Sequence, residues 1–351
     1  RLGGDEFACI ARRLNKKDQA EKLAQRIIAA LSKPFHVDGH VVLIGASVGI
    51  DFITKGKNNP EELIRNADLA LYDAKNNGRG MFSVYHSELH ETLTHRRRLE
   101  AELREALANE EFELHYQPQY DLRNRTLYGF EALVRWSSPR RGLVPPNEFI
   151  AICEESGLIN ELSKWVLRRA CRDAMTWPQP VSVAVNLSPT EFRNKQLVSA
   201  VREILSETGL APARLDIEIT EGVMISDVAN TLSVMSGLRT LGVSISLDVF
   251  GTGYSSLSYI RQFPVNKIKI DKCFISDLEE SNYSLAIIRA VSGLCSSLGI
   301  TSAAEGVETK AQYDILDAER CDIVQGYLTG RPIPLAETFS LFEGETTPRS
   351  T

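Results

Sequence analysis

The sequence contains no apolar run that approaches the roughly 20 residues of a membrane-spanning helix, and residues 1–4 do not begin a signal peptide. Its six cysteines include no Cys-x-x-Cys pair and no nearby histidine at zinc-ligand spacing, which argues against a zinc module and predicts buried free thiols. Basic residues are not in excess, since 40 Lys and Arg face 46 Asp and Glu, so no general positive field attracts DNA, RNA or an anionic membrane. We expect a cytoplasmic chain without membrane contact, and we place any anchor of the full-length protein upstream of Arg1.

With 351 residues the chain has room for about two domains. In residues 1–85, two apolar runs are joined by Asp38 and Gly39, a typical hairpin connection. Apolar residues at helical spacing predict one helix over residues 18–31 and another over residues 60–78. This region offers too few strands for a sheet of its own, so we expect it to be the C-terminal half of a larger α+β domain.

A connecting helix is predicted over residues 86–110, because leucines recur along one face of an otherwise charged segment. We interpret the run Arg96-Arg97-Arg98 within it as a solvated face and not as a nucleic-acid-binding patch. Beyond this helix, short apolar strands alternate with helical segments, a pattern typical of a sheet built from βα units.

Eight strands are predicted after the connecting helix, at residues 112–119, 127–136, 181–187, 215–220, 243–249, 267–271, 300–305 and 322–327. Eight strands in about 230 residues, with helices after the second through the eighth, have the size and rhythm of a (β/α)8 barrel. Only residues 120–126 separate the first two strands, which is too short for a parallel crossover. We therefore predict an α/β fold, a modified (β/α)8 TIM-like barrel with an antiparallel first strand.

Seven of these strands carry an ionisable or amide residue that we assign to the mouth of the barrel, where the active sites of βα barrels lie. The seven are Glu131, Asn186, Glu218, Asp248, Lys269, Glu305 and Gln325. Carboxylate and amide oxygens suit Mg²⁺, Mn²⁺ or Ca²⁺ better than zinc, and one or two such ions offset the repulsion between crowded carboxylates. Two ions can clamp both sides of a phosphodiester displacement, while Lys269 holds the water and Arg135 binds a substrate phosphate.

An alternative interpretation is that these residues form ion pairs that fill the interior of the barrel. The segment after Asp248 argues against this alternative, because Gly251 and Gly253 follow a strand directly and favour a mobile loop at a site. The sequence therefore favours metal-assisted chemistry at the barrel mouth.

The residues at the predicted mouth belong to an ordered series of motifs. The series is Tyr116-Gln117-Pro118, Glu131-Ala132-Leu133, Val185-Asn186-Leu187-Ser188, Glu218-Ile219-Thr220-Glu221, the Asp248 loop, Lys269-Ile270-Asp271, Ala304-Glu305-Gly306-Val307-Glu308 and Gln325-Gly326-Tyr327. In this order the motifs resemble those of the EAL domain, a family that hydrolyses cyclic di-GMP to linear pGpG in bacterial second-messenger signalling. The resemblance covers residues 96–345.

The first region resembles the rear half of a GGDEF (diguanylate cyclase) domain. The matching segments are Gly3-Gly4-Asp5-Glu6-Phe7, Ala46-Ser47-Val48-Gly49-Ile50, Ala67-Asp68-Leu69-Ala70-Leu71-Tyr72 and Ala74-Lys75. The family's upstream half, which supplies a metal-binding Asp, nucleotide contacts and an inhibitory site, does not occur in this sequence. We therefore expect no cyclase activity from residues 1–85.

The EAL resemblance also implies a role for each site residue. It implies that Glu131, Asn186, Glu218, Asp248 and Glu305 bind one or two Mg²⁺ or Mn²⁺ ions. It implies that Lys269, Glu305 and Gln325 act in catalysis, with Lys269 positioning the attacking water and Gln325 hydrogen-bonding around it. It implies substrate contacts at Gln117, Leu133, Arg135 and Asp271, and supporting roles for Glu221 and Glu308, with Glu221 bracing the glycine-rich loop.

One position departs from the family pattern. The family's loop reads Asp-Asp-Phe-Gly-Thr-Gly, and here Val249 stands where the second Asp helps to hold a second metal ion. Two hypotheses follow: a cyclic di-GMP phosphodiesterase, weakened by the lost ligand, and a receptor that binds cyclic di-GMP without cutting it. A third is a protein-interaction role without nucleotide. The resemblance also implies a homodimer formed through the barrel.

Overall fold

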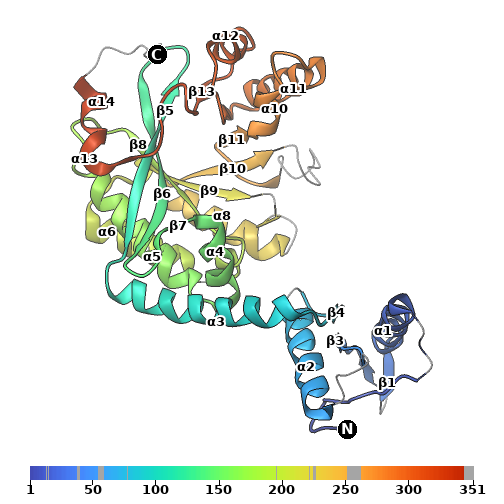
Figure 1. Cartoon of the computed structure of the whole chain (residues 1–351). Coiled ribbons are helices and arrows are strands. Elements are labelled where there is room, and N and C mark those ends of the chain that lie inside the picture. Colours follow the sequence, from blue (N-terminus) through green and yellow to red (C-terminus); the bar gives the residue numbers. More distant parts are fainter. Residues whose placement is uncertain are drawn as a thin grey trace. The chain divides into compact units, whose positions relative to one another are not determined.

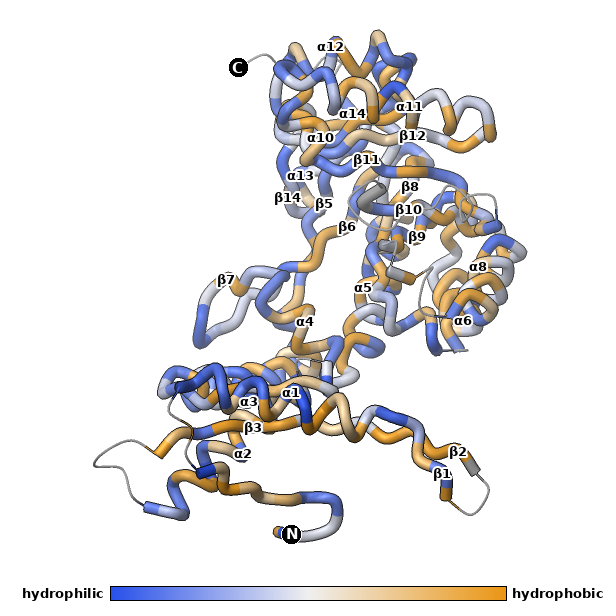
Figure 2. Tube along the Cα trace, turned by 90° about the vertical axis from the view of Figure 1, so that its right-hand side faces the viewer, coloured by the Kyte–Doolittle hydropathy of each residue, from blue (hydrophilic) through white to orange (hydrophobic). Residues whose placement is uncertain are grey.

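The computed structural model describes residues 1–12, 14, 16–37, 40–53, 59–76, 78–194, 196–220, 222–223, 227–250 and 262–343. Its contacts divide the chain into two compact units, Arg1–Glu102 and Leu103–Thr351. Helix α3 (Ser87–Ala108) contains the boundary between them, and it is the connecting helix expected from the sequence. Figure 1 shows its course, and Figure 2 shows that hydrophilic residues predominate along it.

The first unit contains small sheets and two further helices. Its elements are α1 (Lys17–Leu31), β1 (Phe35–Val37), β2 (His40–Val42), β3 (Val48–Ile50), α2 (Pro60–Asn76) and β4 (Phe82–Val84). Strands β1 and β2 are antiparallel with Val37 opposite His40, which confirms the predicted hairpin, and β3 pairs with β4 in parallel. A core cluster joins Ala70 of α2 to Leu89 of α3, while Phe7 and Leu43 remain exposed.

The second unit is a closed barrel of eight strands. They are β5 (Phe112–Asp121), β6 (Leu127–Ser138), β8 (Ser182–Asn186), β9 (Leu215–Thr220), β10 (Ser244–Phe250), β11 (Lys267–Ile270), β12 (Thr301–Ala304) and β13 (Ile323–Val324). Strand β5 is antiparallel to both β6 and β13 and closes the barrel, and the other neighbouring pairs are parallel (Figure 1). This order confirms the predicted modified (β/α)8 barrel with an antiparallel first strand. The first pair is antiparallel because the connection between β5 and β6 is too short for a parallel crossover.

The helices described in the second unit lie between and after the barrel strands from β6 onward. They are α4 (Pro146–Ser156), α5 (Ile159–Ala174), η1 (Glu191–Arg193), α6 (Leu197–Thr208), η2 (Pro212–Arg214), α8 (Val228–Leu241), α10 (Lys272–Ser276), α11 (Asn282–Leu298), α12 (Lys310–Ala318), α13 (Leu335–Thr338) and α14 (Ser340–Glu343). Strands β7 (Gly142–Val144) and β14 (Ile333–Pro334) extend the sheet beside β6 and β5. Helix α5 buries Leu162, Val166 and Ala170, the face that its apolar spacing predicts.

An aromatic cluster supports the closure of the barrel between β5 and β6. Tyr116, Phe130 and Trp177 lie in mutual ring contact, with centroids 4.7–6.3 Å apart. The Tyr116 hydroxyl donates a hydrogen bond to Asp173 of α5 at 2.7 Å. This buried bond satisfies both polar groups and joins the antiparallel strand to the helical layer.

The cysteine prediction is partly wrong. Cys153, Cys171, Cys295 and Cys321 are buried free thiols, as expected, but Cys9 and Cys273 are exposed. Cys273 lies in the first turn of α10, a short helix in which Ile275 is the buried residue, so its side chain is left outside the core. Among the described helices, none is both long and apolar enough to cross a membrane.

A glycine substitution tests the packing of β6 against β8. A Cβ atom on Gly129 would lie 2.5 Å from the backbone oxygen of Ser182, so we expect Gly129→Ala to lower the stability of the barrel by about 1–3 kcal/mol. Gly293, inside α11, is the matched control: a Cβ atom there meets nothing within 4 Å, and Gly293→Ala should raise stability by about 0.5–1 kcal/mol.

Thermal unfolding followed by tryptophan fluorescence measures both variants. This signal reports on the second unit, because it contains all three tryptophans: Trp136, Trp165 and Trp177. Equal melting temperatures for the two variants would contradict the close approach of β6 and β8.

Candidate active site

The residues assigned to the mouth from the sequence lie on neighbouring strands of the barrel. Gln117 is on β5, Glu131 on β6, Asn186 on β8, Glu218 on β9, Asp248 on β10 and Lys269 on β11, while Glu305 and Gln325 directly follow β12 and β13. Since β6, β8, β9, β10, β11, β12 and β13 are parallel, their C-terminal ends open on one side. Contacts among these side chains show which of them the fold brings together.

Lys269 is the centre of the cluster. Its ammonium lies 2.5 Å from Glu218 Oε2, 3.4 Å from Glu131 Oε2 and 4.0 Å from Asp248 Oδ1, and it also forms an ion pair with Glu305. The side chain is only 1% exposed, so water screens these interactions little. One buried cation therefore holds together carboxylates from four different segments of the barrel.

A chain of amide groups continues from Glu131 toward β5. Asn186 Nδ2 donates to Glu131 Oε1 at 2.6 Å, and Gln325 Nε2 donates both to Glu131 Oε2 at 2.6 Å and to Gln117 Oε1 at 3.0 Å. Gln117 Nε2 in turn donates to the carbonyl of Gly330 at 3.1 Å. Both oxygens of Glu131 are thus held in fixed directions, as a ligand or a substrate contact requires.

The carboxyl groups respond differently to burial. Burial raises the pKa of Glu218 well above its usual value even though Lys269 opposes the shift, and it raises the pKa of Glu305 to about 7. Burial also acts to raise the pKa of Glu131, but Lys269 and the hydrogen bonds from Gln325 and Asn186 outweigh it, so the net shift is downward. Near neutral pH Glu131 is therefore an ionised carboxylate, whereas Glu305 can exchange a proton.

The four positions expected to contact substrate lie around this cluster with different partners. Leu133 and Arg135 stand two and four positions after Glu131 on β6, so they share its face of the strand, and both are half-buried. Arg135 Nη1 donates a hydrogen bond to the carbonyl of Val134 at 2.9 Å. Burial lowers the pKa of Arg135, while Glu131 and Tyr327 oppose that shift. Asp271 uses Oδ1 to accept a hydrogen bond from the backbone N–H of Cys273 and so begins α10.

The supporting positions are only partly described. The backbone N–H of Glu308 donates to Gln312 Oε1 at 2.8 Å beside the capping box of α12, and the Glu308 side chain is exposed. Glu221 and the loop residues 251–255 lie outside the described residues, as does the side chain of Val249, whose backbone belongs to β10.

Sequence reasoning missed polar residues that lie beside the cluster. Gln119 Nε2 donates to Gln325 Oε1 at 2.8 Å. Lys267 forms an ion pair with Asp216 at 2.5 Å, and Ser246 Oγ also bonds that carboxylate at 2.7 Å. The sequence spacing indicates three of these residues. Lys267, Asp216 and Ser246 each stand two positions before a site residue, so each shares that residue's face of the strand.

The oxygen donors of the cluster fit a hard divalent cation by their chemistry. Glu131, Asn186, Glu218 and Asp248 offer carboxylate and amide oxygens, and Glu218 Oε1 is buried without a hydrogen-bond partner among the described residues. In the described part of the chain, no three His, Cys, Asp or Glu side chains are arranged around a common metal position. The carboxylates instead surround the Lys269 ammonium.

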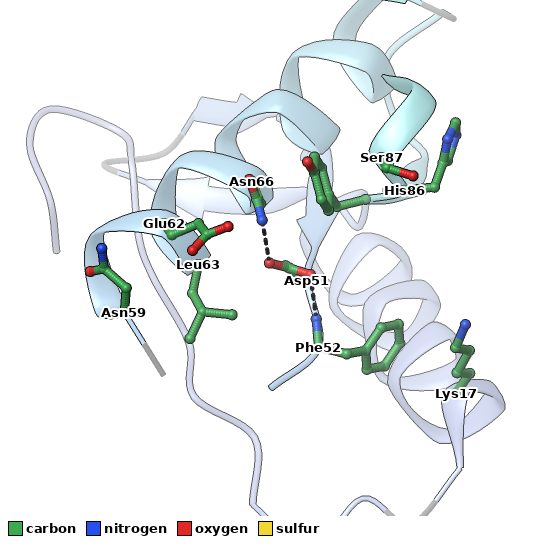
Figure 3. A pocket seen from close by; sticks show the side chains of 10 residues that line it. Lys17, Asp51, Phe52, Asn59, Glu62, Leu63, Asn66, His86 and Ser87 are labelled. Carbon is green, nitrogen blue, oxygen red and sulfur yellow. Dashed lines mark hydrogen bonds between the residues drawn. The ribbon is translucent and has the colours of Figure 1, made fainter. Parts of the chain in front are cut away.

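The first unit contains a pocket of about 220 Å³ that is unrelated to these residues. Asp51 lies at its centre in Figure 3, where Oδ2 accepts from Asn66 Nδ2 at 3.0 Å and Oδ1 accepts from the backbone N–H of Phe52 at 2.7 Å. Both oxygens already have protein partners, so the pocket gives no chemical indication of a ligand.

Comparisons with known proteins agree with this division of the chain. The family model of the EAL domain matches residues 100–332, and that of the diguanylate cyclase GGDEF domain matches residues 1–81. An uncharacterized protein, y4lL of Sinorhizobium fredii, is 46% identical over 343 residues, which are 98% of this chain and 42% of y4lL. The cyclic di-GMP phosphodiesterase NbdA of Pseudomonas aeruginosa is 39% identical over 340 residues, 96% of this chain and 43% of NbdA.

A solved structure of the MucR phosphodiesterase in complex with c-di-GMP is similar to this chain with a TM-score of 0.66 and 39% identity. It covers 69% of this chain, and the match includes 99% of that structure. The chain thus spans less than half the length of the two curated relatives named above, whereas it covers nearly all of the solved MucR structure.

Removing the central cation tests the electrostatics of the cluster. We expect Lys269→Met to destabilise the barrel by about 3–5 kcal/mol at pH 8, because it leaves buried carboxylates without their counter-ion. Because Lys269 lowers the folded-state pKa values of these carboxyls, its removal raises them further, including those of Glu218 and Glu305 that burial already raises. The folded variant therefore takes up protons, and the deficit should shrink as the pH falls toward 5.

Tryptophan-detected urea unfolding at pH 5, 6.5 and 8 measures this deficit. The exposed Lys164, on α5, gives the matched control Lys164→Met, for which we expect no pH-dependent loss. A deficit of equal size for Lys269→Met at all three pH values would show that the carboxylates do not depend on this ammonium.

Proposed function

The chain belongs to the EAL domain family, and from this premise we propose that its barrel is a divalent-metal-dependent phosphodiesterase that hydrolyses cyclic di-GMP to linear pGpG. The observation that carries the proposal is the cluster around Lys269, in which four carboxylates from different strands meet one buried ammonium. Curated relatives such as NbdA are named cyclic di-GMP phosphodiesterases, which supports the choice of substrate and reaction. For the GGDEF-like residues 1–81 we propose no cyclase activity.

The proposed cofactor is Mg²⁺ or Mn²⁺, as one or two ions. We assign its ligands to Glu131, Asn186, Glu218 and Asp248, with Glu305 nearby, since these residues supply the hard oxygens that such ions prefer. When bound, the cation supplies Lewis-acid stabilisation of the charge on the phosphate and promotes deprotonation of a water molecule. Glu218 Oε1 supports this assignment, because this buried oxygen accepts no hydrogen bond among the described residues and its nearest cation, Lys267 Nζ, lies 3.9 Å away.

The reaction forms a bond from a water oxygen to one phosphorus atom of the ring and breaks the P–O3′ bond, whose oxygen leaves with a proton. We assign to Lys269 a hydrogen bond to that water and the offset of phosphoryl charge, because its ammonium pairs with several of the assigned metal ligands. Gln325 holds Glu131 in place. Glu305, whose pKa burial raises to about 7, can accept a proton near neutral pH.

Substrate contacts are proposed at Gln117, Leu133, Arg135 and Asp271. The half-buried Arg135 offers a planar guanidinium for a phosphate on the face of β6 that also carries Glu131. Glu221 and Glu308 retain their proposed supporting roles. The proposal also includes a cytoplasmic location and a homodimer formed through the barrel.

Chromatography of the products tests the function directly. The purified chain is incubated with cyclic di-GMP and Mn²⁺, and we expect pGpG to appear. Glu131→Gln should lower the rate by about 100-fold, because it removes a carboxylate held by Lys269, Asn186 and Gln325. Absence of product from the wild-type chain would contradict the enzyme, and micromolar binding without product would support the receptor instead.

The companion variant Val249→Asp restores the family's second acidic residue. If the missing oxygen limits turnover, this variant should form pGpG faster than the wild-type chain at the same Mn²⁺ concentration. An unchanged rate would mean that Val249 does not weaken the site.

A further inference from the structure

Strands β9, β10 and β11 are neighbours in the barrel (Figure 1), and each carries one more buried polar residue two positions before its active-site residue: Asp216, Ser246 and Lys267. Lys267 Nζ lies 2.5 Å from Asp216 Oδ2, and Ser246 Oγ lies 2.7 Å from both oxygens of that carboxylate. The Lys267 ammonium also lies 5.5 Å from the centre of the Tyr128 ring. Lys267, Asp216 and Ser246 therefore form a second polar layer, one level before Lys269, Glu218 and Asp248, in which Lys267 Nζ has an ion-pair partner but no hydrogen-bond partner among the described residues.

This layer is as deeply buried as the cluster itself. The side chains of Lys267 and Asp216 are 3% and 5% exposed. Burial lowers the pKa of Lys267, but the attraction of Asp216 and Glu218 outweighs it and the net shift is upward, so the ammonium stays charged. Branched apolar side chains usually fill this part of a βα barrel, and replacing a buried ion pair with them is often neutral or stabilising. Stability alone therefore gives no reason for charges here.

The two layers meet at Glu218. Its Oε2 lies 2.5 Å from Lys269 on the mouth side, and its Oε1 lies 3.9 Å from Lys267 on the other side. The Glu218 side chain is fully buried, and Oε1 has no hydrogen-bond partner in the described part of the chain. The carboxylate is thus fixed between two cations, each of which attracts one oxygen.

We propose that Lys267 is a positioning residue of the active site, which together with Asp216 and Ser246 fixes the orientation of the Glu218 carboxylate. The inference rests on the proposed function, since Glu218 is one of the assigned metal ligands. Asp216 and Ser246 hold the Lys267 ammonium in one place, and the ammonium holds Glu218 Oε1 by attraction across 3.9 Å. Without this support the Glu218 carboxylate is free to turn toward Lys269 with both oxygens, and fewer remain for a divalent cation.

A paired variant separates positioning from folding. Lys267→Met combined with Asp216→Asn removes one positive and one negative charge while nearly preserving side-chain size, and Glu218 keeps Lys269 as its counter-ion. We expect a melting temperature near that of the wild-type chain, about tenfold weaker Mn²⁺ binding by isothermal titration calorimetry, and about tenfold lower kcat for cyclic di-GMP with little change in KM. These substitutions do not touch the substrate, so KM should not follow kcat.

The exposed pair Lys310 and Asp314 on α12 supplies the matched control, because Lys310→Met with Asp314→Asn removes an ion pair that lies on a helix and not on a strand of the cluster. It should leave Mn²⁺ affinity unchanged. Wild-type Mn²⁺ affinity and kcat in the folded Lys267/Asp216 variant would overturn the inference.

Ser246→Ala tests the positioning role of Lys267 if the paired variant does not fold. Removing the Ser246 hydroxyl leaves the Asp216 charge to Lys267 alone and draws the ammonium away from Glu218, so we expect Mn²⁺ binding about threefold weaker. Unchanged binding would overturn the inference. Mn²⁺ binding by the wild-type chain without pGpG formation would contradict the proposed function alone, and absence of Mn²⁺ binding would contradict both.

Discussion

The attraction between one buried ammonium and several carboxylates is the constraint on which the barrel mouth depends. Glu131, Glu218, Asp248 and Glu305 come from four segments of the chain, and each lies within 4.0 Å of Lys269. Placed together in a poorly screened interior, these carboxylates would repel one another, and the strands would have to separate or the groups would have to take up protons. Lys269 lowers that cost, so the fold can keep a concentrated set of oxygen donors where the strands end.

The alternation of side chains along β-strands places a second set of charged residues one level deeper in the barrel than the Lys269 cluster. Residues two positions apart share one face, so the strands that carry Glu218 and Lys269 also carry Asp216 and Lys267 one level deeper. Opposite charges then alternate from Asp216 through Lys267 and Glu218 to Lys269. The alternative interpretation, that the seven mouth residues form ion pairs inside the barrel, describes the contacts that Lys269 makes with the carboxylates around it, and the pair of Lys267 and Asp216 adds a further ion pair one level deeper.

Much of the fold could be predicted because the barrel strands are short apolar runs between turn signals. The strand at residues 215–220 was placed at its observed bounds, and the antiparallel start followed from the length of one connection. The last strand was predicted as residues 322–327, but β13 contains only Ile323 and Val324. Beyond Val324 the backbone N–H groups of Thr329 and Gly330 donate to the carbonyl of Gly326, and a Cβ atom on Gly326 would lie 2.1 Å from the carbonyl oxygen of Val307, a close approach of two segments that no local pattern encodes.

The residues at the mouth could be predicted because charged residues are rare in apolar strands. The contacts that each of them makes could not be predicted from the sequence. Assigning one polar residue to each strand overlooked Lys267, since it stands at the beginning of β11, while Lys269 lies nearer the C-terminal end. Which carboxylate each lysine meets depends on the register of β9 against β10 and β11 in three dimensions.

The most direct test of this account is the pKa of Lys269 itself. A pH titration followed by NMR of the lysine side chains, with Lys269 assigned by the resonance that disappears in Lys269→Arg, measures it in the intact chain. Burial lowers this pKa, but Glu131, Glu218 and Glu305 outweigh it, so the account predicts an ammonium that remains protonated beyond the ordinary lysine pKa of 10.5. A titration midpoint at or below 10.5 would contradict the central role of this cation.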